Sequence, residues 1–449
     1  MKHDGAENRQ PRGGFSTGAV AEVQGLYGPF SFPEKLLQQI WFRGEFDAAR
    51  LATADGRAVK VLHPGRWNRL GGPDFKQARL RIGGESVTGD VEVHLHAQDW
   101  AGHRHAADPA YDDVVLHVVL FPGDASASAP ASPGAGGRPI PIAVLLPLLW
   151  HDLEEYAADA AVERLALHPM ARAREELLAM REGDLRAELG RLAAERWARK
   201  VHFAKLRAAR LGWEAACHHA ALEILGYRAN RAPMLAIATE WPLDAWRKNA
   251  AAAADADAAG AAGQLAGAAQ FADAVFTETA ARGAWSKQGA RPANHPRARL
   301  RQYARWVAAN PDWPARLPHV FAHQKSAAAP STRAWRQANA AQKLRATVEN
   351  KICGGAIGGT RLDNLVCDGF LPLLATRYGA DMAWLAHCWR HWWTGDMPEQ
   401  IAPLLKGLRM TGTRDQPACH GLAQGLLGWL LANEDAPPRD DGDGKTARE

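Results

Sequence analysis

The chain has 449 residues, of which 47% are hydrophobic and 23% are charged, and its formal net charge is +5. This composition is typical of a folded globular protein, and the length exceeds what one hydrophobic core usually supports, so we expect two or three domains. No apolar stretch reaches the roughly 20 residues that a membrane-spanning helix needs, and the polar start has no apolar region like that of a signal peptide. These features argue against a membrane partner and predict a cytoplasmic protein.

The N-terminal part begins with a predicted helix and continues as strands. A helix is expected over 33–42, because proline suits the first turn and the glutamate after it favours the helix dipole. A strand is expected over 58–63, after an Asp-Gly turn. Two further strands, 78–82 and 90–96, flank a Gly-Gly pair, so a hairpin is predicted there.

The strand predicted over 90–96 carries an unusual set of polar residues. Polar and apolar residues alternate strictly, so Asp90, Glu92, His94 and His96 should share one face, with two valines and a leucine on the other. Buried polar side chains cost free energy unless they are paired. The polar face therefore predicts a functional site rather than core packing.

A second carboxylate, Asp74, precedes the first strand of the predicted hairpin. Two carboxylates on adjacent strands repel each other unless a cation lies between them, and Mg²⁺ or Mn²⁺ is the usual occupant of an all-oxygen site. Such an ion lowers the pKa of a bound water. We therefore predict that Asp74 and Glu92 bind Mg²⁺ or Mn²⁺ and that His94 positions or deprotonates the water.

This pattern resembles the PD-(D/E)xK nuclease superfamily, with Pro73-Asp74 as the "PD" and Glu92-Val93-His94 as the "ExK". The resemblance implies an α-β-β-β-α-β core and metal-dependent cleavage of nucleic acid. His94 stands where the superfamily has a lysine, and neutral imidazole lacks that permanent charge. Lys60 or Lys76 is a candidate for the missing cation.

The chain as a whole resembles an uncharacterised bacterial family, a domain of unknown function. The resemblance rests on the segments GPDF, GDVEVH, Asp99-Trp100 with the following His-x-His, and VVLHVV, and it spans roughly 25–430. It implies no activity, so any chemistry must come from the residues themselves.

Several further polar residues surround the predicted site. His103 and His105 could bind Zn²⁺ together with His94 or His96, because imidazole suits that ion, or they could order a loop through hydrogen bonds. His117 lies in an apolar strand and is either a hydrogen-bonded core residue or part of the cleft. The supporting candidates are Asp90, His96, Asp99, His103, His105 and His117.

The remaining segments complete the expected organisation. Residues 114–121 and 141–146 are predicted strands, and the Pro/Ala/Ser/Gly tract at 122–139 between them reads as a flexible insertion. Helices should follow 148, interrupted by a loop or ragged helix at 249–269. Five widely spaced cysteines without a CxxC pair indicate neither disulfides nor a cysteine zinc site, so they should be buried.

The predicted class is therefore α+β. A mixed-sheet α/β domain over 20–150, resembling a restriction-endonuclease-like core, should precede a mostly α-helical domain over 151–432. A disordered tail is expected over 433–449.

A basic block lies within the predicted helical domain. Residues 282–348 hold thirteen Lys/Arg and a single acid, a balance of +12, so the rest of the chain is −7. Tryptophans and a tyrosine are interleaved with the arginines, as in surfaces that bind phosphates and stack on bases. An arginine-rich solvated face with core tryptophans is the alternative. The nucleic-acid-binding candidates are Arg291, Arg297, Arg299, Arg301 and Arg305.

These observations favour a metal-dependent phosphodiesterase acting on nucleic acid. One alternative is a catalytically inactive nucleic-acid-binding or scaffold protein on a degenerate nuclease fold, because the lysine is missing. Another is a metal-dependent hydrolase of a different phosphate or small-molecule substrate that uses the histidines.

Overall fold

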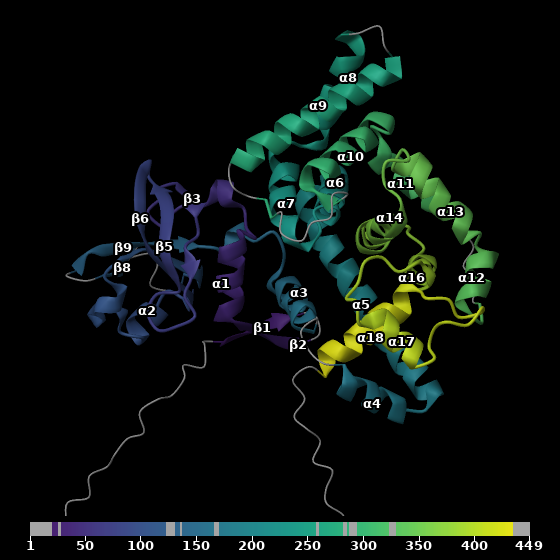
Figure 1. Cartoon of the computed structure of the whole chain (residues 1–449), viewed down its shortest axis with the longest axis horizontal. Helices are drawn as coiled ribbons and strands as arrows, with labels where there is room; N and C mark the ends of the chain where they lie inside the picture. Colours follow the sequence, from purple (N-terminus) through teal and green to yellow (C-terminus); the bar gives the residue numbers. More distant parts are fainter. Residues whose placement is uncertain are drawn as a thin grey trace, which may run out of the picture. The chain divides into compact units, whose positions relative to one another are not determined.

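The computed structural model describes residues 20–25, 28–122, 131–134, 137–165, 170–256, 260–281, 285–286, 294–322 and 329–433. Its contacts divide the chain into two compact units, Met1–Leu149 and Trp150–Glu449, which we call the sheet unit and the helical unit (Figure 1). A mixed sheet followed by helices confirms the predicted α+β class.

The sheet unit contains a two-stranded hairpin, β1-β2, and a larger mixed sheet with strand order β3-β5-β6-β7-β9-β8, in which β4 also pairs with β5. β5 is antiparallel to β3 and β6, whereas β6, β7 and β9 run parallel. The strands are β1 (Val20–Gly25), β2 (Gly28–Pro33), β3 (Val59–His63), β4 (Arg66–Trp67), β5 (Phe75–Ile82), β6 (Glu85–His96), β7 (Val114–Phe121), β8 (Ala131–Pro133) and β9 (Pro139–Val144).

The predicted Gly-Gly hairpin is confirmed. Ile82 of β5 pairs with Glu85 of β6, which leaves Gly83 and Gly84 as the two turn residues. Their φ angles are 59° and 95°, and a turn with positive φ at both central positions matches the twist of the flanking strands. The turn sets the register that brings the start of β5 beside the polar part of β6.

The predicted N-terminal helix is also confirmed, as α1 (Glu34–Arg43). It buries Leu37, Ile40 and Trp41 and packs against β6. Gly44 ends the helix in the left-handed region, with φ of 63°, and its N–H is bonded to carbonyls of the last turn. α1 therefore presents its first turns to the strand that carries Glu92 and His94.

The connection between β6 and β7 is short and compact. It contains α2 (Asp99–Gly102) and two 3₁₀ turns, His105–Ala107 and Pro109–Tyr111. Trp100 and Tyr111 are buried with residues of β7 and β9, so the connection is packed onto the sheet. This packing places His103 and His105 above the end of β6.

Two segments differ from their predictions. Residues 131–133, within the tract predicted to be a flexible insertion, form β8 and pair with β9, and Ser132 is buried. Most of 249–269, predicted to be a loop or ragged helix, belongs to two helices, because alanine favours helix strongly enough to offset the glycines. The predicted disordered tail lies almost entirely outside the described residues, which end at 433.

The helical unit is built around a tryptophan-rich core, and α18 packs along the long helix α5. Two segments, Val348–Ile352 and Leu365–Phe370, are π-helical. The α-helices are α3 (Leu153–Leu165), α4 (Ala171–Ala179), α5 (Glu182–Leu211), α6 (Trp213–Leu225), α7 (Arg231–Glu240), α8 (Leu243–Ala256), α9 (Gly260–Ala281), α10 (Pro296–Ala309), α11 (Trp313–Phe321), α12 (Thr332–Ala338), α13 (Ala341–Thr347), α14 (Gly359–Asn364), α15 (Leu371–Leu374), α16 (Met382–His391), α17 (Ile401–Gly407) and α18 (His420–Ala432).

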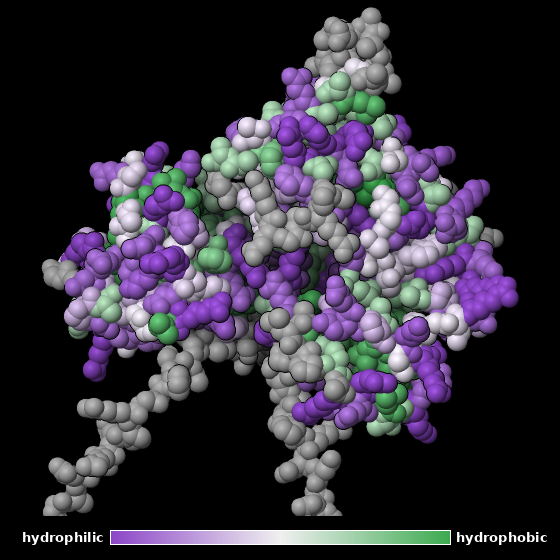
Figure 2. All heavy atoms as spheres, in the orientation of Figure 1, coloured by the Kyte–Doolittle hydropathy of each residue, from purple (hydrophilic) through white to green (hydrophobic). Residues whose placement is uncertain are grey.

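Burial of the cysteines follows the sequence-based expectation. All five cysteines are free and buried, as predicted. In the described part of the chain, no helix combines the length and apolar character needed to cross a membrane. The face shown in Figure 2 is largely hydrophilic, with hydrophobic residues scattered among polar ones.

Candidate metal centre

Nitrogen and oxygen donors converge at the end of β6. Glu92 Oε1 lies 3.3 Å from His94 Nε2 and 3.5 Å from His105 Nε2, and the two nitrogens are 3.3 Å apart. A fourth donor, His103 Nδ1, lies 3.3 Å from His94 Nε2. We call these four side chains the His–Glu cluster.

The spacing within the His–Glu cluster matches the edges of a tetrahedral coordination shell. Ligand atoms about 2.0–2.1 Å from a tetrahedral Zn²⁺ lie about 3.3–3.4 Å from one another. Glu92 Oε1, His94 Nε2 and His105 Nε2 form a nearly equilateral triangle with such edges. The three histidines by themselves also offer one ligand atom each within 4.8 Å of one another. The donor set therefore fits a metal ion.

Two elements of the fold supply these donors. Glu92 and His94 alternate on β6, so both side chains lie on one face, as predicted. His103 and His105 come from the connection after α2, where Arg104 between them has a φ of 58°. A left-handed arginine is uncommon, and such strained residues often accompany functional sites. The turn at Arg104 aims both neighbouring imidazoles at β6.

A hydrogen-bonded chain supports His94 from behind. His94 Nδ1 lies 2.9 Å from His117 Nε2, and His117 Nδ1 lies 2.8 Å from Ser132 Oγ. If each imidazole carries its proton on Nδ1, then His94 Nδ1–H donates to His117 and the His94 Nε2 lone pair faces the cluster. Metal-bound histidines usually donate their other N–H to a partner in this way. His117 is therefore a hydrogen-bonded buried residue that also contacts the site.

Asp74 holds Glu92 in place. The Asp74 backbone N–H donates to Glu92 Oε2 at 3.0 Å, which leaves Oε1 facing the histidines. The Asp74 carboxylate accepts hydrogen bonds from Gln38 Nε2 at 2.7 Å and from the Val93 backbone N–H at 3.0 Å. The predicted proximity of Asp74 and Glu92 is therefore present, with Asp74 bonded to neighbouring protein groups. Its role as a metal ligand stays a prediction.

Three carboxyl groups lie close enough to affect one another. Burial, together with the charge of Asp74, raises the pKa of Glu92, and burial raises the pKa of Asp74. Burial and the charges of Asp74 and Asp99 raise the pKa of Glu34 to about 8. Glu34 Oε2 is buried, and no hydrogen-bond partner for it exists among the described residues. Crowded carboxyls with raised pKa values favour a bound proton or cation.

Three buried histidines, His94, His105 and His117, are held in the neutral form. Burial, followed by the neighbouring imidazoles, lowers the pKa of His94 to about 2. Burial and His103 lower the pKa of His105 to about 4, and burial and His105 lower that of His117 to about 3. Neutral imidazole is the form that binds metals. The ring of His105 also stacks on Tyr111, with centroids 3.8 Å apart.

The other predicted supporting residues make contacts of their own around the His–Glu cluster. Lys76 Nζ donates to Asp90 Oδ2 at 2.8 Å, and its charge lowers the pKa of Glu92. Lys76 is therefore nearer than Lys60, which pairs with the far end of β5. Asp99 accepts from the backbone N–H of His96, whose ring stacks on Phe121 rather than joining the cluster.

The basic block contains both exposed and internal arginines. Arg297 and Arg301 are exposed and both bind Asp273, an acid from outside the block. Arg299 is 7% exposed and bonds to Tyr227 and Asn294, so it has an internal structural role. Arg305 is exposed.

Most aromatic residues of the block are buried, and Trp285 is partly buried against the tryptophan-rich core. The interpretation of them as a base-stacking platform is wrong, because burial in the tryptophan-rich core is the stronger driving force for such large apolar rings. Arg291 lies outside the described residues. The fully buried aromatic residues are Tyr303, Trp306, Trp313 and Trp335.

Three residues of the site escaped the sequence analysis. Glu34 and Gln38 are one turn apart on α1, where Glu34 lies beside the Leu95 backbone and Gln38 donates to Asp74, and this i, i+4 polar pair could have been noticed on an otherwise amphipathic helix. Ser132 lies in a tract of low complexity, and no signal in the sequence distinguishes it from its neighbours.

Comparisons with known proteins give a family and no relative of known activity. A family model described as "Protein of unknown function (DUF2851)" matches residues 34–374, which include the whole His–Glu cluster. No curated protein and no solved structure matches the chain.

Proposed function

Since this chain belongs to the DUF2851 family of unknown function, we propose from its own residues that it is a metal-dependent hydrolase centred on the His–Glu cluster. The observation that carries the proposal is the triangle of Glu92 Oε1, His94 Nε2 and His105 Nε2, with edges of 3.3–3.5 Å. Two imidazoles and one carboxylate are the protein ligands of several catalytic zinc sites.

The cluster has one ligand that differs from the rest. Glu92, His94 and His105 are buried, whereas His103 is exposed. The exposed side is the place for a water or a substrate oxygen, with His103 nearby as a fourth ligand or as a proton donor. A bound ion would lower the pKa of that water. Glu34 and Asp74, whose charges act on Glu92, are the candidates to accept its proton, because a bound cation would also lower their raised pKa values and leave them ionised.

The nuclease resemblance supplies the substrate class, a phosphodiester of nucleic acid. Between α1 and β7 the sheet unit has β3, β4, β5, β6 and the four-residue helix α2, which is the α-β-β-β-α-β order that the resemblance implies with the two-residue strand β4 added. The nitrogen-rich donor set favours Zn²⁺ or another transition metal that binds imidazole over Mg²⁺. Mg²⁺ or Mn²⁺ bound by Asp74 and Glu92 alone is the alternative centre.

Metal analysis of the purified protein tests the centre. We expect close to one equivalent of a transition metal, and less than a tenth of that in Glu92→Gln and His105→Asn, because each removes one corner of the triangle. His96→Asn is the matched control, since His96 is on the same strand but outside the cluster. Unchanged metal content in Glu92→Gln and His105→Asn, with the fold intact by circular dichroism, would refute the centre.

Activity is tested with labelled single- and double-stranded DNA and RNA, with Zn²⁺, Mn²⁺, Mg²⁺ or EDTA. We expect cleavage that EDTA abolishes and that Glu92→Gln reduces at least 100-fold. Salt-sensitive binding without cleavage would support the inactive binding protein. If nucleic acid is neither bound nor cut while the metal is present, small phosphate esters are the next substrates to test.

A further inference from the structure

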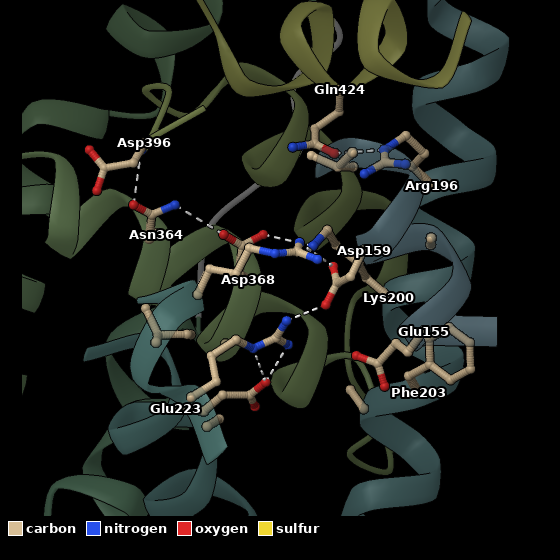
Figure 3. Close-up of a pocket in the computed structure, with 18 of the residues that line it drawn as sticks. Glu155, Asp159, Arg196, Lys200, Phe203, Glu223, Asn364, Asp368, Asp396 and Gln424 are labelled. Carbon is tan, nitrogen blue, oxygen red and sulfur yellow. Dashed lines mark hydrogen bonds and ion pairs between the residues drawn. The ribbon is translucent and has the colours of Figure 1, made fainter. Parts of the chain in front are cut away.

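The helical unit contains a cavity of about 360 Å³. It is lined by α3, α5, α6 and α18 and by the π-helical segment Leu365–Phe370 (Figure 3). Charged side chains from these helices point toward its centre. The residues that line the cavity belong to the helical unit, whereas the His–Glu cluster belongs to the sheet unit.

Most cations that line the cavity are paired with carboxylates. Lys200 Nζ lies 2.7 Å from Asp368 Oδ1, and Arg207 Nη2 lies 2.8 Å from Glu223 Oε2. Arg231 binds Glu223 as well, and the remaining arginines of the lining have partners of the same kind. A ligand would have to break these ion pairs to use the cations that form them.

Arg196 is the exception. Its Nε donates to Gln424 Oε1 at 2.7 Å, and no carboxylate of the described residues lies within 4 Å of its guanidinium. Figure 3 shows Gln424 beside Arg196 at one end of the cavity. Because Gln424 holds the Nε side, the two Nη groups are left for another partner. Burial, followed by the charge of Arg199, lowers the pKa of Arg196 to about 10, so the group is still cationic at neutral pH.

The other residues that line the cavity indicate the chemistry of that partner. Phe203, Ile224, Leu373 and Leu427 contribute apolar surface to the same cavity. A cavity of this size holds a small organic molecule rather than a polymer. A guanidinium with two free nitrogens binds carboxylate or phosphate through two parallel hydrogen bonds.

We propose that this cavity binds a small organic anion whose carboxylate or phosphate group is held by Arg196 and whose apolar part contacts Phe203 and Leu427. The paired residues around it, such as Lys200 with Asp368, keep the remaining charges balanced and give the cavity its shape. The anion neutralises the one cation of the lining that lacks a carboxylate among the described residues.

Isothermal titration calorimetry of the full-length protein with inorganic phosphate, phenyl phosphate, benzoate and neutral benzamide tests this site. We expect saturable binding of phenyl phosphate or benzoate and none of benzamide. Preference for phenyl phosphate would assign a phosphate ester, and preference for benzoate would assign a carboxylate. No saturable binding of any of the three anions would overturn the proposal.

Variants separate the proposed site from unspecific anion binding. Arg196→Gln should weaken binding of the preferred anion at least tenfold, and Arg196→Lys, which keeps the charge without the fork, should weaken it less. Arg191→Gln, on the exposed side of the same helix, is the matched control and should bind as the parent does. Equal affinity in Arg196→Gln and the parent, with both folded by circular dichroism, would contradict the assignment. If Arg196→Gln does not fold, Gln424→Ala should still weaken binding, because Arg196 then loses the partner that orients it.

Discussion

The ion-pair network of the helical unit and the His–Glu cluster each contain a buried glutamate, and the two glutamates have opposite surroundings. In the helical unit, buried Glu223 is surrounded by cations: Arg207 at 2.8 Å, His151 at 3.2 Å and Arg231. In the sheet unit, Glu92 is equally buried but faces neutral imidazoles and other carboxyls. The first carboxylate already has its counterions, and the second lacks them.

The pKa values of the two glutamates are shifted in opposite directions. Although burial alone would raise it, the charges of Arg207, His151 and Arg231 hold the pKa of Glu223 well below its usual range. Burial and Asp74 move the pKa of Glu92 in the other direction. Structural ion pairs and binding sites both perturb ionisation, and the sign distinguishes them here. A buried acid with a raised pKa among metal-competent donors is suited to bind a cation, as proposed for the His–Glu cluster.

The largest loss of stability is expected when the ion-pair network around Glu223 is broken. Glu223→Gln removes the charge that balances Arg207, Arg231 and His151, so one buried and two half-buried cations lose their common partner. Removing one member of a buried ion pair costs about 3–5 kcal/mol. Urea denaturation should show a loss of this size. A loss below about 1 kcal/mol would mean that water already screens the network.

A somewhat smaller loss of stability is expected when the pH is raised. Although burial alone would lower it, Glu223 and Glu155 raise the pKa of His151 to about 9 from its usual 6.5. The resulting stability is complete below pH 6.5 and is lost as the pH rises to about 9, at most about 3 kcal/mol. Unfolding midpoints in urea between pH 6 and 9.5 measure this. His151→Asn should flatten the slope, whereas the exposed His319→Asn should leave it unchanged.

The hydrogen-bonded chain behind the proposed metal centre should contribute less to metal affinity than the ligands themselves do. Ser132→Ala removes the group that orients His117 and, through it, His94. Loss of such an outer partner typically lowers metal affinity about 10–100-fold. Competition with a chromophoric chelator measures the change. Ser86→Ala, on the exposed part of β6, is the control. Equal affinities in the two variants would show that the hydrogen-bonded chain does not tune the centre.

The smallest loss of stability is expected when the exposed arginines are replaced. Arg297 and Arg301 share Asp273 at the surface, where ion pairs contribute little, so replacing both with glutamine should leave the melting temperature nearly unchanged. If they contact phosphates, the log–log salt dependence of nucleic-acid binding should become shallower by about 0.7–0.9 per lost contact. An unchanged slope would remove these two arginines from any nucleic-acid surface.

Much of the sheet unit could be predicted from local pattern. The alternation over 90–96 determined that Glu92 and His94 share a face, since side chains on a strand alternate with period two. The Gly-Gly pair determined the hairpin, because its turn requires positive φ at both positions. These features depend on neighbours within a few residues, and the sequence shows those neighbours directly.

The composition of the site was decided only by the tertiary structure. His105, His117, Ser132 and Glu34 come from four separate segments, and the convergence of their side chains depends on how the connection after α2, β7, β8 and α1 pack around β6. The same holds for the tryptophans of the basic block, whose spacing suited either a surface or a core. Sequence alone determined which polar side chains share a face of β6, whereas burial and long-range packing determined which other side chains join them, because those contacts link residues that no local period relates.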